Sequence, residues 1–346
     1  MNNNNKKEKI MNKITKLGVS ALCGSLAAVS SANAGDLTVT GTVDMSWISM
    51  DDEITGNPIG LGSNYSFAGS GELDNGWGVA LSIAIGNKNN YSSTNVVVTV
   101  PALGDFKIGG GTTGSGIDRI DDVTPNVWEE AYATGMSNGM QTVNGSISGR
   151  GIEWTPNMLP DGMTARIFVT PDTSGGAASN DKAYSGSATN QGTGYDITVE
   201  LGEAMTGMSG LTIGGGFSNT DNPLTGLGDI EDSTVYATYA VGGFTVGYQW
   251  SEADLGTTTG ATQYENDGYG ITFAINDDLS IGYNHYESDQ SNSGGDVTNE
   301  ATSMQIAYSV GGASIRLAEG QSDNQDYQTG AAYDRDNTVL SVSLAF

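Results

Sequence analysis

The chain has 346 residues, and its thirteen Lys and Arg against forty Asp and Glu give a formal net charge of −27 at neutral pH. Nucleic acid is therefore not an expected partner, because its binding is driven by clustered cations. Fifty-one glycines against seven prolines favour turns and closely packed strands. The sequence contains no run of eighteen apolar residues that would predict a transmembrane helix.

The N-terminal segment has the features of an export signal. Five lysines lie among the first sixteen residues and precede an apolar stretch, 17–30, that is too short to span a bilayer as a helix. Small residues at 32–34 then supply a cleavage site, so we expect residues 1–34 to be a signal peptide. Because Cys23 lies within it, the mature chain has no cysteine and no disulfide or thiol site.

Apolar and polar residues then alternate in sixteen segments, a pattern typical of β-strands with two different faces. In the first segment, Leu37 and Val39 share one face, while Thr38 and Thr40 share the other. Most segments are about 8–11 residues long, which suits a tilted membrane strand. The predicted strands are 36–50, 63–73, 76–86, 94–100, 105–111, 147–156, 163–171, 192–201, 211–218, 233–241, 243–252, 267–275, 279–287, 301–310, 312–320 and 337–346.

The links between these segments alternate between short and long. Asn-Gly and Gly-Gly pairs in the short links accept positive φ at low cost and predict tight hairpins. The short links are 74–76, 101–104, 157–162, 202–210, 242–243, 276–278 and 311–312, and the long links are 51–62, 87–93, 112–146, 172–191, 219–232, 253–266, 288–300 and 321–336. This rhythm places both chain ends on the short-turn side, as in bacterial outer-membrane barrels.

The composition of the two faces favours a membrane barrel over a soluble sheet. One face is rich in Thr, Ser, Gly, Asn and Gln, as a water-filled lumen requires, and aromatic residues such as Trp47 and Trp250 lie near strand ends. The mean hydropathy of −0.25 is compatible with this, because only alternate residues meet lipid. We therefore predict an all-β fold with one domain, 35–346. It is a closed antiparallel transmembrane β-barrel of sixteen strands, with short periplasmic turns, long extracellular loops, and Asp36 near Asn337 at the seam.

The last predicted strand ends the chain on an aromatic residue. Val342, Leu344 and Phe346 share one face, while Ser341 and Ser343 lie on the other. This pattern resembles the C-terminal sorting signature of Gram-negative outer-membrane proteins. The resemblance implies recognition by the barrel-assembly machinery and a location in the outer membrane, in contact with lipid and lipopolysaccharide.

The mature chain as a whole resembles the general porins of the Gram-negative outer membrane, which are sixteen-stranded channels that assemble as homotrimers. The resemblance rests on the signal peptide, the link rhythm, the long third link, the terminal Phe346, and the segment 150–156 (Arg-Gly-Ile-Glu-Trp-Thr-Pro). That segment is similar to the strand after the third loop in one branch of the family. The resemblance implies passive diffusion of small hydrophilic solutes and ions, with the third loop, 112–146, folded into the pore.

By the same resemblance, the charged residues of the third loop form the pore constriction: Asp118, Arg119, Asp121, Asp122, Glu129 and Glu130. Strand alternation turns Lys107, Arg166 and Arg316 inward, together with Asp44 and Glu153. Fixed charges in a narrow passage set local ion concentrations. Acids outnumber bases, so we expect a preference for cations or neutral solutes. An exposed acidic loop and internal salt bridges that are silent in transport are the alternatives.

Two other classes of function stay open. A substrate-selective channel would share the barrel but needs dedicated binding residues, whereas a secreted all-β adhesin or surface-layer protein would share export and acidity. Enzymatic activity is not expected, because the only histidine, His285, has no catalytic partner at a recognisable spacing. No cofactor is expected, although the acidic segments 51–53, 229–232 and 334–336 offer clustered carboxylates to Ca²⁺.

Overall fold

The computed structural model describes residues 37–50, 57–87, 90–110, 114–134, 138–146, 150–173, 192–222 and 226–346. The predicted signal peptide, 1–34, and the acidic segment 51–53 lie outside these residues. Among the described residues, no helix is both long and apolar enough to cross a membrane.

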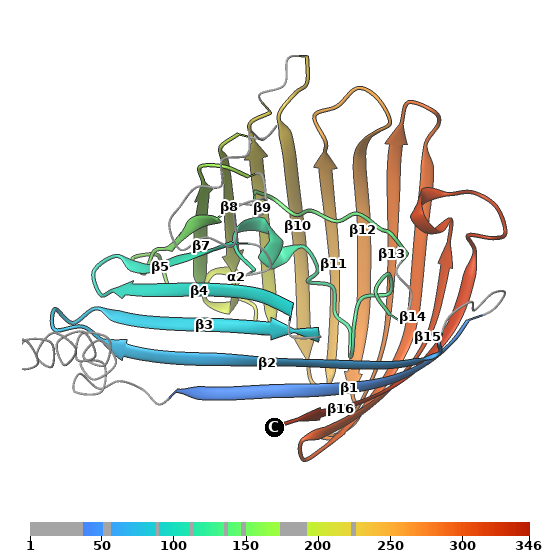
Figure 1. Ribbon diagram of the computed structural model, residues 1–346, viewed down its shortest axis with the longest axis horizontal. Coiled ribbons are helices and arrows are strands. Elements are labelled where there is room, and N and C mark those ends of the chain that lie inside the picture. Colours follow the sequence, from blue (N-terminus) through green and yellow to red (C-terminus); the bar gives the residue numbers. More distant parts are fainter. Residues whose placement is uncertain are drawn as a thin grey trace, which may run out of the picture.

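The described residues form sixteen β-strands that close into one antiparallel barrel (Figure 1), which confirms the predicted fold class. In Figure 1 the wall made by β1–β4 crosses the wall made by β9–β13 steeply, as expected for tilted strands on opposite sides of a barrel. The strands are β1 (Thr38–Met50), β2 (Ile59–Glu72), β3 (Gly78–Gly86), β4 (Asn90–Val100), β5 (Gly104–Gly110), β6 (Arg150–Thr155), β7 (Met163–Thr170), β8 (Gly194–Leu201), β9 (Leu211–Thr220), β10 (Ile230–Val241), β11 (Phe244–Asp254), β12 (Ala261–Ala274), β13 (Leu279–Asn292), β14 (Val297–Val310), β15 (Ala313–Asp323) and β16 (Arg335–Ala345). Short helical turns are η2 (Gly116–Ile120), α2 (Glu203–Thr206) and η4 (Gln325–Tyr327).

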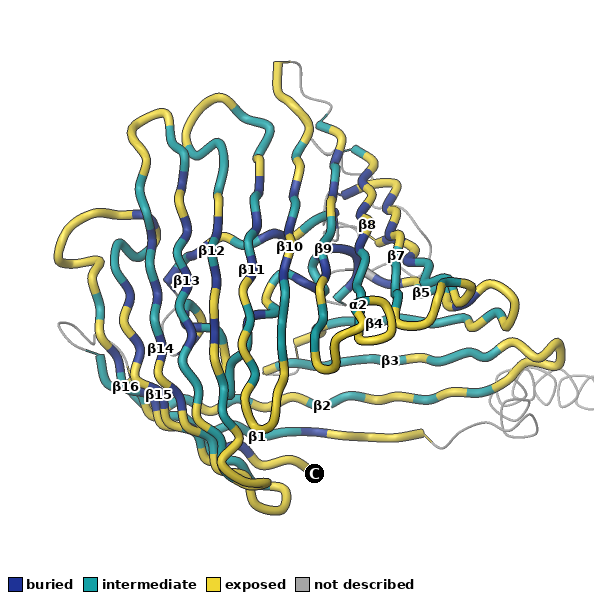
Figure 2. The backbone as a smooth tube through the Cα atoms, turned by 180° about the vertical axis from the view of Figure 1, so that it is seen from behind, coloured by how far each residue is buried: buried dark blue, intermediate teal, exposed yellow. Residues whose placement is uncertain are grey.

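Burial alternates along the strands in the sense opposite to that of a soluble protein. The large apolar side chains of Ile271 and Leu317 are 43% and 39% exposed, whereas Asn284 and Ser303 are each 1% exposed. Figure 2 shows buried and exposed residues following one another along β10–β14. An apolar outer surface of this extent requires lipid around it, and the polar residues face the lumen.

The seam that closes the barrel lies between β1 and β16. In an antiparallel pair the beginning of one strand meets the end of the other. Asn337 accordingly lies opposite Met50, at the far end of β1 from Thr38; Asp36, which was expected near Asn337, lies outside the described residues. The chain terminus closes the seam instead: Phe346 N–H donates to Gly41 O, and Phe346 O accepts from Gly41 N–H, both at 3.0 Å.

The second link, predicted to be long over 87–93, is short. β3 ends at Gly86, and β4 already begins at Asn90, which pairs with Gly86. A register shift between Ala84 and Ile85 allows the two strands to keep pairing past the last apolar residues. The additional strand residues are polar. The sequence therefore shows no alternation of apolar and polar residues there that would predict a strand. The strict alternation of link lengths is therefore wrong at this position.

The strands β12, β13 and β14 have 14 residues each, more than the predicted length. Their additional residues place carboxylates opposite one another on the outer face, as in the pairs Glu265–Asp289 and Glu287–Glu300. Directly opposed like charges are unfavourable, and lipid would make them more so. These strand ends therefore project beyond the lipid. Because their sequences are polar, a prediction based on the apolar residues of each strand missed them.

The terminal aromatic ring generates a prediction about the seam. A Cβ at Gly41 would lie 2.7 Å from Phe346 Cζ and 3.1 Å from Asn64 O. Gly41→Val should therefore displace the ring and lower the temperature at which the folded barrel unfolds on a semi-native gel. The matched control is Gly69→Val on β2, because a Cβ there meets only Leu37 Cδ1, at an ordinary 3.8 Å. Equal unfolding temperatures for the two variants would contradict a role of Phe346 in closing the barrel.

Candidate functional site

The third loop lies against the polar inner face of the barrel wall. Ile117 and Ile120, from η2 at its start, are buried together with Val143 near its end and Tyr236 of β10. Mutual burial of these apolar side chains stabilises the loop on the wall. The approach is close because β9 presents a glycine there: a Cβ at Gly216 would lie 3.1 Å from Ile117 Cγ1.

Amide side chains of the wall bind the loop backbone. Gln249 on β11 donates to Ile120 O at 2.7 Å. Gln305 on β14 accepts from Trp128 N–H at 3.0 Å and donates to Glu129 O at 2.5 Å. A primary amide carries both donors and an acceptor, so one side chain can satisfy both kinds of backbone group. The loop backbone therefore stays hydrogen-bonded beyond η2, where it belongs to neither a helix nor a sheet.

Two further amides extend this attachment across the barrel. Asn284 on β13 donates to Glu129 O at 3.2 Å, and Asn337 on β16 donates to Thr134 O at 2.9 Å. None of the four amides was among the predicted site residues, because neutral side chains on an inward face looked like ordinary lumen lining. The signal that could have found them is the recurrence of Asn or Gln on the inward face of several strands from β11 to β16.

One buried carboxylate holds both ends of the loop. Asp196 on β8, 0% exposed, accepts hydrogen bonds from Ile117 N–H at 3.1 Å and, on its other oxygen, from Ser146 N–H at 3.1 Å and Ser146 Oγ at 2.5 Å. Gly116 and Gly145 flank this carboxylate at positive φ, and a Cβ on them would lie 1.9 and 2.6 Å from Asp196 Oδ2. Asp196 was not among the predicted site residues, because no local pattern links a strand residue to both ends of a loop distant in sequence.

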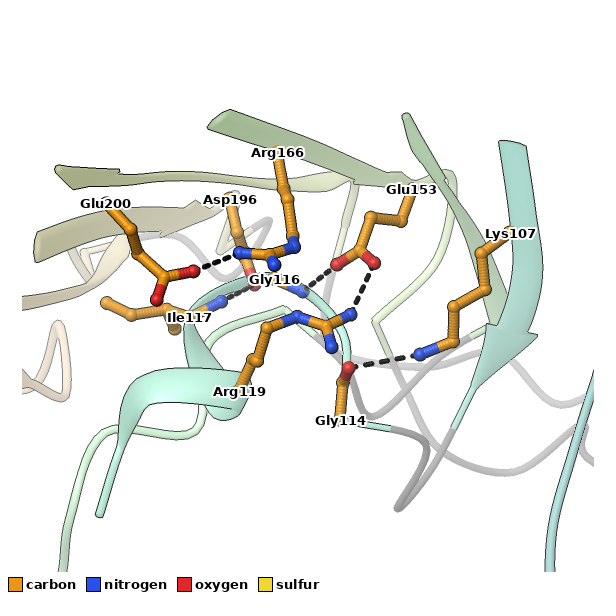
Figure 3. A network of polar contacts seen from close by, with 9 residues as sticks. All are labelled: Lys107, Gly114, Gly116, Ile117, Arg119, Glu153, Arg166, Asp196 and Glu200. Carbon is orange, nitrogen blue, oxygen red and sulfur yellow. Dashed lines mark hydrogen bonds and ion pairs between the residues drawn. The ribbon is translucent and has the colours of Figure 1, made fainter. Parts of the chain in front are cut away.

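Figure 3 shows how the predicted charges near the start of the loop are paired. Glu153 on β6 is 2% exposed and accepts from Gly116 N–H at 2.7 Å and from Arg119 Nη2 at 2.6 Å. Lys107 on β5 donates to Gly114 O at 3.0 Å. The basic Arg119 of the loop therefore binds Glu153 of the wall, and Glu153 helps to hold the loop on the wall.

The two other predicted wall cations also have partners. Arg166 on β7 forms an ion pair with Glu200 on β8 (Figure 3). Arg316 on β15 lies 3.9 Å from Asp44 on β1, and its guanidinium lies 5.9 Å from the ring centre of Trp128 in the third loop. The structure thus places these residues on the inner wall, where partners offset much of their positive charge.

The acidic side chains of the loop keep partial exposure. Burial raises the pKa of Asp118 to about 6, with a further contribution from Asp122. Burial and the neighbouring Asp122 carboxylate raise the pKa of Asp121 to about 8, and burial raises that of Glu130 to about 7. Burial likewise raises the pKa of Glu129. These groups therefore carry less negative charge near neutral pH than their number implies.

The remaining predicted residues lie away from the loop. Leu344 and Phe346 are exposed, on the face shared with half-buried Val342. His285 stacks on Tyr269 on the outer face at a ring distance of 4.8 Å. Within the described ranges, no group of three or more His, Cys, Asp or Glu could hold a metal ion. Of the acidic segments considered for Ca²⁺, 51–53 lies outside the described residues.

A family model described as Gram-negative porin matches residues 18–343. No curated protein matches the sequence. Among solved structures, OmpF of Salmonella typhi in complex with daunomycin is 12% identical with a TM-score of 0.64, covering 90% of this chain and 97% of its own.

Two further structures are similar. An anion-selective porin from Comamonas acidovorans is 14% identical with a TM-score of 0.62, and covers 90% of this chain and 100% of its own. In-vitro folded OmpT of Vibrio cholerae, in its trimer form, is 12% identical with a TM-score of 0.62, and covers 90% of this chain and 99% of its own. At such identities the structures establish the fold alone. The family match spans nearly the whole sequence, and the chain therefore belongs to the Gram-negative porins, channel-forming β-barrels of the bacterial outer membrane.

Proposed function

We propose that this porin is a water-filled channel for passive diffusion of small hydrophilic solutes and ions, with a preference for cations or neutral solutes. The observation that carries the proposal is the attachment of the third loop along the inner wall, from Asp196 on β8 to Asn337 on β16. A loop held in this way narrows the lumen without sealing it. The polar lining supplies the hydrogen-bonding surface that hydrated solutes need.

The preference for cations follows from which charges are paired. Arg119 and Arg166 bind the carboxylates of Glu153 and Glu200, and Lys107 donates to a backbone carbonyl. The acids of the third loop outnumber these cations, so the loop contributes net negative potential to the passage. The porin from Comamonas acidovorans is anion-selective on the same fold, so selectivity has to come from side chains.

General diffusion is favoured over a channel dedicated to one substrate. Binding of a particular solute needs aromatic or polar side chains that are accessible from the pore. Tyr236 and Tyr286, on the inner faces of β10 and β13, are only 5% and 3% exposed. Packing beneath the third loop makes these rings unavailable to a passing solute. A secreted adhesin is disfavoured, because the apolar outer belt requires lipid.

The assembly of the protein is part of the proposal. We infer export by the segment 1–34, recognition of Val342, Leu344 and Phe346 by the barrel-assembly machinery, and contact with lipopolysaccharide and lipid. The trimer form of Vibrio cholerae OmpT supports a homotrimer for this chain as well. Catalysis has no part in the proposal, since the family and fold are those of channels.

Removing the loop carboxylates tests the function. The triple variant Asp118→Asn, Asp121→Asn, Asp122→Asn should lower the cation-to-anion permeability ratio by roughly twofold or more, because fixed negative charge is lost from the passage. The zero-current potential across a planar bilayer in a salt gradient measures this ratio. The shift should be largest near 0.01 M salt, where the Debye length is roughly 30 Å.

The matched control removes three carboxylates from the outer face of β11–β13, with Glu252→Gln, Glu265→Gln and Asp289→Asn. These side chains oppose one another across the strands and lie outside the lumen. Their loss should change the permeability ratio much less. An equal effect of the two triple variants would show that selectivity comes from the diffuse charge of the surface and would contradict the assignment to the loop.

The raised pKa values give the pH dependence a definite sign. An acid with a raised pKa stays neutral up to a higher pH, so Asp121, Glu130 and Asp118 should lose charge in that order as the pH falls from about 8 to 5. Cation selectivity should therefore decrease over this range. The zero-current potential recorded in steps between these pH values is the measurement. Selectivity that stays constant until carboxylates of ordinary pKa titrate near 4 would contradict the prediction.

A further inference from the structure

The last outer loop, 324–334, connects β15 to β16 and contains the short helical turn η4, shown in red in Figure 1. This loop contacts the third loop. Asp326 N–H donates to Asn138 O at 2.8 Å. Gln141 N–H donates to the hydroxyl of Tyr327 at 3.0 Å. Both acceptor and donor positions on the third loop belong to its returning limb, 138–141. One hydrogen bond thus joins the two loop backbones directly, and a second joins the tyrosine side chain to the backbone of the third loop.

The backbone of the last outer loop is strained at this contact. Asn324, Asp326 and Tyr327 have φ of 54°, 55° and 55°. Asparagine and aspartate visit this left-handed region occasionally, but a bulky aromatic residue there is an outlier. Such a conformation persists only where the surroundings determine it. The contact with the third loop therefore holds a conformation that the loop would not adopt by itself.

Buried groups on both sides of the contact hold the last outer loop in this conformation. Tyr327 is 6% exposed, its hydroxyl lies 2.7 Å from Ser288 Oγ on β13, and its ring lies 5.1 Å from that of Tyr264 on β12. A Cβ at Gly139 of the third loop would lie 2.0 Å from Asp326 Oδ1. Only glycine, here at φ 74°, leaves room for the close approach.

The limb that receives these contacts is itself fixed to the wall. Asn138 is 1% exposed, and its side chain donates to Asn299 Oδ1 at 3.0 Å. Asn299 on β14 returns a hydrogen bond to Asn138 O, also at 3.0 Å. The carbonyl of Asn138 therefore accepts from both the wall and Asp326, which makes this residue the meeting point of barrel, third loop and last outer loop.

We propose that Tyr327 is a positioning residue for the pore: it fixes the returning limb of the third loop, so that the last outer loop sets the opening of the channel from the extracellular side. This role rests on the proposed function, because it concerns the loop that we assign to the constriction. The tyrosine hydroxyl is the group that joins the limb to β13. Without it, the ring can still pack, but the limb loses its bond to the wall through Ser288.

The test compares Tyr327→Phe with Tyr333→Phe, which removes a hydroxyl from a 37% exposed tyrosine of the same loop. Tyr327→Phe should make transitions between conductance levels of single channels several-fold more frequent. It should also accelerate hydrogen exchange at the amides of Gln141 and Asp326 by roughly tenfold or more, because local opening becomes easier. Tyr333→Phe should change neither quantity. The zero-current potential should stay unchanged in both variants, since no charge is removed.

Unchanged exchange at these two amides in Tyr327→Phe would overturn the proposal, and so would faster exchange with unchanged single-channel recordings. If Tyr327→Phe does not fold, Ser288→Ala removes the other partner of the same hydrogen bond and should produce the same two changes. A wild-type protein that does not conduct would overturn the proposed function. The exchange measurement would still decide whether Tyr327 fixes the third loop.

Discussion

Lipid offers no hydrogen-bonding partner to a peptide group, and this constraint governs the whole molecule. A sheet in lipid must satisfy every strand edge with another strand, so β1 has to meet β16 and the barrel has to close. Closure leaves the apolar residues outside and the polar residues inside. A barrel of this kind has little apolar core of its own, and its inner wall offers unpaired amides, hydroxyls and carboxylates to whatever enters it.

The third loop forms hydrogen bonds with these groups of the inner wall, and the bonds determine the path of the loop along the wall. Backbone groups that a loop normally leaves to water are bound here by Gln249, Gln305 and Asp196. Because the partners come from strands on several sides of the barrel, the path of the loop is fixed at many separated points. The same bonding occupies carboxylates such as Glu153 and Asp196, and we therefore propose that the charge met by a permeating ion comes from the remaining acids of the loop.

The sequence predicted those parts of the fold that depend on local alternation. Ser341 and Val342 already show which face of the last strand meets lipid, and the same reasoning holds for most strands. It failed where a strand continues on polar residues, as at Asn90 and Glu265, because outside the membrane neither face needs to be apolar. It also failed for the partners of the third loop. Gln305 and Glu129 are joined across most of the mature chain, and no local pattern records such a contact.

The central claim is that the loop bound to the inner wall leaves a water-filled passage of restricted width. Liposome swelling with uncharged sugars of increasing size tests it most directly. The account predicts rapid swelling with the smallest sugars and a steep fall in rate as the solute grows, since a narrow passage hinders larger solutes disproportionately. Swelling at rates independent of solute size, or the absence of swelling with every sugar, would contradict it.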